Sequence, residues 1–187
     1  GTQRLPRLIG VQAALPIMMS GNPVGAAKAE ELGAIDHVTE GDLLKESIAF
    51  TEKLLARDAP LRRLCDSQID PASIPQNYYD EFRAANARRT RGYFSPERII
   101  SAVQAAVDMT FENGMNRERE LFTECMRSPE SVALRHVFFA ERQAAKVVGL
   151  TKDTPLRKIE RVAMIGAGTM GGGIAMNFAS KGIPVYM

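Results

Sequence analysis

Three glycines near the C-terminal end of the chain have the spacing of a nucleotide-binding turn. Gly166, Gly168 and Gly171 form a G-x-G-x-x-G pattern after an apolar run and before an alanine-containing stretch typical of a helix. In such a turn the first glycine permits the tight change of direction, the second lets the backbone approach a pyrophosphate, and the third lets helix and strand pack closely. The N-terminus of the helix presents unpaired N–H groups to the phosphates. The pattern therefore predicts dinucleotide binding, with Thr169 and Met170 in the same turn.

A strand, a helix and a second strand must surround these glycines for them to bind a dinucleotide. Residues 162–165 form the continuous apolar run of a buried parallel strand, and a second β-rich run begins at Ile183, after Gly182. The acidic residue that distinguishes NAD from NADP is expected about 20 residues beyond the glycines, after Met187. The residues present predict the first β-α-β of a Rossmann domain. They leave open the choice between nicotinamide and flavin dinucleotides.

The chain up to Gly149 is predicted to be mainly helical. Apolar residues at helical spacing, bounded by capping residues, prolines and glycines, predict helices over residues 2–19, 23–33, 42–57, 79–85, 95–114, 117–126 and 129–146. Asn22 and Asp42 are expected to cap the helices that follow them, with Pro23 in a first-turn position. Residues 34–38 are expected to be extended.

The polar, proline-containing segment 150–157 is typical of a linker. The predicted organisation is therefore a helical part over residues 1–149, the linker 150–157, and the start of a Rossmann domain over residues 158–187. Both ends of the sequence fall inside predicted elements, so we expect it to be part of a longer protein. The predicted fold class is α/β for the longer protein, and mainly α-helical plus one β-α-β for this chain.

Composition excludes some classes of partner. The 187 residues are 45% hydrophobic and 25% charged, as in ordinary globular proteins. The net charge of +2 is too small for the positive field of a dedicated nucleic-acid-binding protein. No apolar run approaches the roughly 20 residues that a membrane-spanning helix requires. We therefore expect neither nucleic acid nor a membrane span.

The two cysteines and two histidines do not predict a metal site. Cys65 and Cys125 form no C-x-x-C pair, which favours free thiols in a reducing compartment. The cytoplasm is the expected location, with the peroxisome or mitochondrion as alternatives in a eukaryote. Neither His37 nor His136 has a second ligand at a metal-binding spacing.

One basic cluster allows two interpretations. Arg88, Arg89 and Arg91 lie close together in the sequence and adjoin Arg83. Such clusters are usually solvated helix faces. A site for substrate phosphates is the alternative.

Two pairs of acidic residues have the spacing of catalytic carboxylates, Glu30 with Glu31 and Glu118 with Glu120. Charged or small residues flank both pairs, so nothing in the sequence would raise a carboxyl pKa. We expect solvated helix faces rather than an acid–base pair.

The motifs together resemble the bifunctional enoyl-CoA hydratase/3-hydroxyacyl-CoA dehydrogenases of fatty-acid β-oxidation. The run MIGAGTMGGGIAMNFASKGIPVYM looks like the start of their NAD-binding dehydrogenase domain. GTQRLPRLIG, followed by MMSGNPVGAAKAEELGAIDHV, is similar to the second half of their crotonase-like hydratase domain. The helical stretch that begins SPERIISAVQAAV looks like the C-terminal helices of that domain. Motifs of both domains, in this order, cover most of the chain.

This resemblance implies that the reacting groups lie outside the chain. The hydratase glutamates of the family precede the GTQRL motif, and the dehydrogenase His-Glu pair follows the glycine turn by a long interval, so no catalytic residue is expected within residues 1–187. The resemblance also implies that Phe139 and Arg142 contact the adenine and phosphate of CoA. Core packing of Phe139 is the alternative.

The resemblance implies that the longer protein hydrates trans-2-enoyl-CoA and oxidises the resulting 3-hydroxyacyl-CoA with NAD. Acyl-CoA thioesters would be its substrates, and a thiolase subunit or a second copy of the protein its partner. One alternative is a dehydrogenase whose hydratase half has become an isomerase or inactive. Another is a non-catalytic helical binding or assembly module with a glycine turn.

Overall fold

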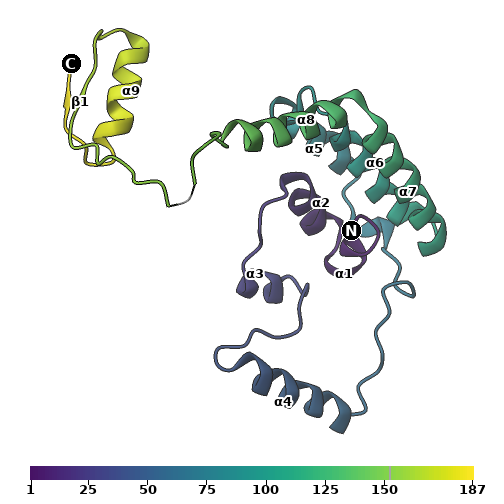
Figure 1. The fold of residues 1–187 in the computed structure, drawn as a ribbon. Coiled ribbons are helices and arrows are strands. Elements are labelled where there is room, and N and C mark those ends of the chain that lie inside the picture. Colours follow the sequence, from purple (N-terminus) through teal and green to yellow (C-terminus); the bar gives the residue numbers. More distant parts are fainter. Residues whose placement is uncertain (152) are drawn as a thin grey trace. The chain divides into compact units, whose positions relative to one another are not determined.

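The computed structural model describes residues 1–151 and 153–187, so Lys152 of the predicted linker lies outside the described residues. The helices and strands fall into two units, Gly1–Phe139 and Ala140–Met187 (Figure 1). The predicted fold class is confirmed, because the first unit is helical and the second contains a short β-α-β. The boundary between the units falls N-terminal to the predicted linker. The domain bounds 1–149, 150–157 and 158–187 stay a prediction.

Eight α-helices and one 3-10 helix are described between residues 1 and 144. They are α1 (Leu5–Ile9), α2 (Val11–Ser20), α3 (Ala26–Glu31), α4 (Leu43–Ala56), η1 (Pro71–Ser73), α5 (Tyr78–Thr90), α6 (Ser95–Asp108), α7 (Phe111–Arg127) and α8 (Pro129–Ala144), which continues into the second unit. None of the helices in the described part of the chain is long and apolar enough to cross a membrane.

Helix α6 is central to the first unit. The core is made by Val11 and Leu15 of α2 together with Ile100 and Val103 of α6. Each such side chain contributes about 1.5–3 kcal/mol when fully buried. Buried alanines of α6 occupy little space, and α6 packs against α1, α2 and α7. Aromatic residues at the start of α5 pack against the same core.

The predicted helix over residues 2–19 is wrong as a single element, because Gly10 divides it into α1 and α2. Gly10 has φ +81°, a conformation that glycine adopts without a steric penalty. Pro16 lies inside α2 without ending it. The break is therefore at the glycine and not at the proline.

Helix α3 starts later than predicted. Gly25 is its N-cap residue, and no side chain caps the helix. The predicted cap at Asn22 and the first-turn position of Pro23 are therefore wrong. Gly33 follows the helix with φ +75°, which confirms the predicted end. Residues 34–36 form bends, and no strand is described over residues 34–38, where an extended segment was predicted.

The cap of α4 is confirmed. The backbone N–H of Lys45 donates to Asp42 Oδ1 at 2.9 Å, which satisfies one of the free donors of the first turn.

The boundary between α6 and α7 differs from the prediction. Helix α6 ends at Asp108, and the Thr110 side chain caps α7 by accepting from the Asn113 N–H at 3.3 Å. Gly114 was expected to end the preceding helix but lies inside α7. A Cβ at Gly114 would approach Gln3 Oε1 to 2.1 Å. The glycine thus makes room for a side chain from the other end of the unit.

The second unit contains β1 (Val162–Ala163), α9 (Thr169–Ala179) and β2 (Val185–Tyr186). The strands are parallel, with Val162 opposite Val185 and Ala163 opposite Tyr186. The strand predicted over residues 162–165 is shorter, although the Met164 N–H still donates to the Tyr186 carbonyl at 2.7 Å. This is the predicted β-α-β arrangement.

Candidate functional site

The turn between β1 and α9 is built around contact between its first and third glycines. Gly166 has φ +107°, in the region that L side chains rarely adopt. A Cβ at Gly171 would lie 2.0 Å from the Gly166 carbonyl oxygen and 3.1 Å from its carbonyl carbon. Because these are backbone atoms, no side-chain movement could relieve the clash. Gly166 and Gly171 therefore have the turn and close-packing geometry that their spacing predicted.

The N-terminus of α9 has free hydrogen-bond donors. Its first backbone hydrogen bond runs from the Gly172 N–H to the Gly168 carbonyl at 3.0 Å. The N–H groups of Thr169, Met170 and Gly171 precede it and lack a helical acceptor. No side chain caps the helix and no acidic residue lies in its first turn. The end of the helix is electrostatically suited to an anion.

Packing within the described residues does not explain why position 168 is a glycine. Its φ is −70°, which any residue adopts, and a Cβ there would meet no atom within 4 Å. Open space on this side allows another molecule to approach the backbone. Ile165, before the turn, and Met170, in the first turn of α9, are 99% and 79% exposed.

Helix α9 packs inward through one buried residue of its own. Ala175 is the buried residue, Phe178 is half-buried and Ile174 is 38% exposed. Met164 also contributes, since its Cγ lies 3.7 Å from the Cβ position of Gly171. The sequence signal for Met164 was its place at the end of the apolar run.

The predicted CoA-contact residues lie on α8. Phe139 is 64% exposed, and its ring contacts the Phe138 ring edge-to-face with centroids 5.2 Å apart. Helix α8 has no buried residue, so the alternative of core packing for Phe139 is not met in the described residues. Arg142 follows on the same helix and is exposed. Contact with CoA stays a prediction.

Half of the arginine cluster is engaged in structural contacts. Arg83 pairs with Asp80 at 2.9 Å and Glu97 at 2.7 Å, and the hydrogen bond to Glu97 is the chief cause of its raised pKa. Arg89 donates to the Ser20 carbonyl at 3.3 Å. Arg88 and Arg91 are exposed. The arrangement favours a structural and solvated cluster over a phosphate site.

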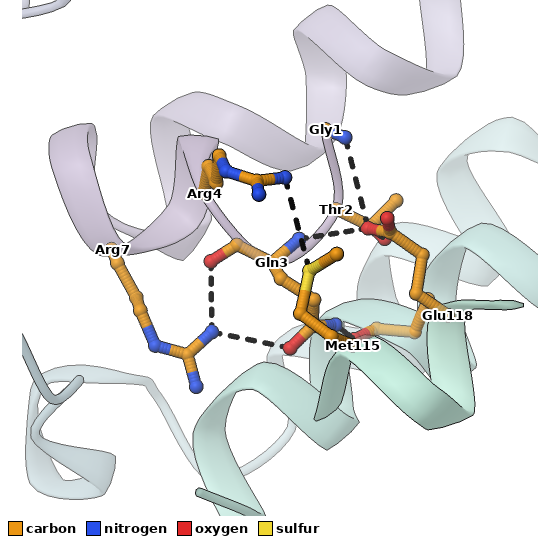
Figure 2. A network of polar contacts seen from close by, with 8 residues as sticks. Gly1, Thr2, Gln3, Arg4, Arg7, Met115 and Glu118 are labelled. Atoms are coloured by element: carbon orange, nitrogen blue, oxygen red, sulfur yellow. Dashed lines mark hydrogen bonds and ion pairs between the residues drawn. The ribbon is translucent and has the colours of Figure 1, made fainter. Parts of the chain in front are cut away.

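Glu118 does not lie on a solvated face, contrary to the prediction. The Thr2 hydroxyl and the Gln3 N–H, the latter at 3.1 Å, donate to Glu118 Oε2 (Figure 2). Burial raises the pKa of Glu118, but the hydrogen bonds from Thr2 and Gln3 outweigh burial and lower it. Glu118 is thus an anchoring carboxylate with a weakened basicity.

The other acidic residues agree with the prediction of exposed helix faces. Glu120 pairs with Arg117 at 2.9 Å, and Glu31 pairs with Lys28. Glu30 lies 3.7 Å from His37. All are exposed apart from Arg117, which is half-buried. These contacts give no pair of carboxyl groups in a shared pocket.

Gln3 is a structural residue that the sequence analysis missed. Its side chain is fully buried, and Gln3 Nε2 donates to the Ala102 carbonyl at 2.7 Å. The Arg7 guanidinium donates to the Gln3 carbonyl at 2.8 Å and to Oε1 at 3.1 Å (Figure 2). It also lies over the Phe111 ring. The role of Gln3 could not be predicted from the sequence, because its partners are distant and have no regular spacing to it.

The described residues contain no cluster of three or more His, Cys, Asp or Glu side chains that could hold a metal ion. His37 stacks on Phe50 with ring centroids 5.6 Å apart, and both cysteines are free thiols.

Residues 161–187, which contain the whole glycine turn, match the family model for the NAD-binding domain of 3-hydroxyacyl-CoA dehydrogenase. The match confirms the predicted start of such a domain at this place in the chain.

Curated proteins named peroxisomal bifunctional enzyme are similar over 99% of the chain. The identity is 38% for those of Cavia porcellus and Homo sapiens and 35% for that of Danio rerio. The chain spans 26% of the length of each of these relatives. The predicted resemblance to bifunctional enzymes is confirmed by this similarity.

Proposed function

We propose that the turn between β1 and α9 binds the pyrophosphate of NAD. The observation that carries this proposal is the contact between the first and third glycines, together with the free N–H groups of Thr169, Met170 and Gly171. Gly166 supplies the turn, Gly171 brings the helix against it, and Gly168 leaves space for the phosphates. The match of residues 161–187 to an NAD-binding domain supports NAD as the dinucleotide.

The chain's own part in the reaction is to hold the cofactor. When bound, NAD supplies the hydride acceptor for oxidation of an alcohol. The three N–H groups and the positive end of the α9 dipole would neutralise pyrophosphate charge and fix the cofactor's position. We place the groups that move protons outside residues 1–187, so the chain alone is predicted to bind NAD without turning over substrate.

The longer protein, on this proposal, hydrates trans-2-enoyl-CoA and oxidises 3-hydroxyacyl-CoA. The name of the relatives supports two activities on one chain and favours the peroxisome over the cytoplasm as the location. Acyl-CoA thioesters are the proposed substrates, and a thiolase subunit or a second copy the proposed partner. The exposure of Phe139 supports its proposed contact, with Arg142, to the adenine and phosphate of CoA.

A coupled assay tests these activities. A longer protein that contains this sequence is given crotonyl-CoA and NAD, and NADH is followed by absorbance, with the present chain as control. NADH from the longer protein alone supports both activities. NADH only with 3-hydroxybutyryl-CoA points to an isomerase or inactive hydratase half. If neither substrate gives NADH, the proposed activities are contradicted and the helical binding module is the better explanation.

A further inference from the structure

Three Ser-Pro or Thr-Pro dipeptides occur in the sequence, at Ser95, Ser128 and Thr154. Some protein kinases that require proline after the acceptor hydroxyl also favour a basic residue three positions after it. Thr154 is followed by Pro155 and Arg157, and Ser95 by Pro96 and Arg98. We propose that Thr154 is a phosphorylation site for a proline-directed protein kinase. We also propose that the fold prevents phosphorylation of Ser95 and Ser128.

Ser95 and Ser128 lie at helix starts. Ser95 and Pro96 are the first residues of α6, and Arg98 is engaged, with its guanidinium 3.7 Å from the Phe94 ring centroid and 3.3 Å from Glu124. Ser128 is 7% exposed, and its hydroxyl accepts from the Ser131 N–H at 3.1 Å. A kinase must lay the residues around its acceptor along a groove and align the hydroxyl with ATP. Helical backbone prevents this at Ser95, which is exposed, and burial prevents it at Ser128.

Thr154 lies in an irregular segment. Residues 155–161 have neither helix nor strand structure, Leu156 is 93% exposed, and Pro155 and Arg157 are exposed as well. The Thr154 Oγ1 accepts from the Thr151 N–H at 2.9 Å and lies 3.4 Å from the Thr151 hydroxyl. These contacts are local to one turn. The residues that follow the acceptor are therefore free to adopt an extended conformation in a kinase groove.

The modification is a phosphoryl transfer from ATP. The Thr154 oxygen forms a bond to the γ-phosphorus, the bond to the β,γ-bridging oxygen breaks, ADP leaves, and the hydroxyl proton passes to the catalytic carboxylate of the kinase. The product carries about −1.5 to −2 charges at neutral pH. Arg157 and Lys158 follow at once in the sequence, and the Thr151 N–H already faces the acceptor oxygen. Basic side chains and backbone N–H groups both bind phosphate oxygens.

The test uses the full chain, a purified proline-directed kinase, and ATP with magnesium, with phosphate located by mass spectrometry. One phosphate on Thr154 is expected. Thr154→Ala should remove it, while Ser95→Ala and Ser128→Ala should leave it unchanged. No incorporation, or phosphate on Ser95 or Ser128 of the folded chain, would overturn the proposal.

Synthetic peptides of residues 91–101 and 150–160 separate the effect of the fold from that of the motif. Both peptides should be phosphorylated, because both carry the proline and the basic residue. Ser95 would then be protected in the folded chain by its helix. A Pro155→Ala variant keeps the hydroxyl and should be phosphorylated at least tenfold more slowly. An unmodified 150–160 peptide, or no effect of Pro155→Ala, would contradict a proline-directed site.

Discussion

At the scale of single residues, some glycines in and after the turn are required by packing and others are not. Gly171→Ala places a Cβ 2.0 Å from a backbone oxygen, so the turn must open. We expect at least tenfold weaker NAD binding, measured by NADH fluorescence titration. Gly173→Ala is the matched control, since its Cβ meets nothing within 4 Å and alanine favours helix. Equal affinity of both variants would show that the contact is irrelevant to binding.

Gly114 is required for a different reason. Gly114→Ala gains up to about 1 kcal/mol of helix propensity. It also forces the buried Gln3 amide away from its partners, and overpacking of this kind costs about 1–3 kcal/mol. We therefore expect a net loss of up to about 2 kcal/mol in the free energy of unfolding, measured by urea denaturation followed by circular dichroism.

A double-mutant cycle identifies the cause of this loss. In a Gln3→Ala background the space beside Gly114 is open, so the alanine should become neutral or stabilising. An unchanged penalty in that background would mean that Gln3 is not what excludes a side chain at position 114.

At the scale of elements, a negative charge at the N-terminus of α9 should have opposite effects on helix stability and on anion binding. Thr169→Asp places a negative charge in a first turn that has none, which should stabilise α9 by about 0.3–1 kcal/mol. The same charge repels pyrophosphate. We expect slower hydrogen exchange of the α9 amides and weaker NAD binding. Asn177→Asp, near the other end of α9, should instead leave binding unchanged. A Thr169→Asp variant that binds NAD normally would contradict the proposed role of the helix end.

The segment before α1 is held to α7 by Glu118, which predicts a pH dependence. The folded-state pKa of Glu118 is below its ordinary value, so its stabilising contribution is complete above the unfolded-state pKa. The contribution is lost as pH falls through the folded-state pKa. Between pH 5 and pH 3, acid should therefore destabilise the wild type more steeply than Glu118→Gln, measured by urea denaturation at each pH. Parallel pH profiles would mean that Glu118 gains nothing from its hydrogen bonds.

At the scale of the whole molecule, several local signals were predictable, although the cap expected at Asn22 was wrong, and distant contacts were not predictable. Asp42, Gly33 and the glycine turn act through neighbouring residues, so their sequence context suffices. Gly10 was missed because its break depends on a single positive φ within an apolar pattern. Gln3, Gly114 and Glu118 come together only when both ends of the first unit pack, and no sequence spacing encodes that contact. The same distinction explains why Gly171 could be predicted and Gly114 was assigned to the wrong place.

The central claim is that the turn between β1 and α9 binds the pyrophosphate of NAD. The most direct measurement is a titration of the ¹⁵N-labelled chain with NAD, followed by amide chemical shifts. We expect shifts at residues 166–172, reproduced by ADP-ribose, absent with nicotinamide alone and lost in Gly171→Ala. Undisturbed amides in this turn at saturating NAD, or the same shifts in Gly171→Ala, would contradict it.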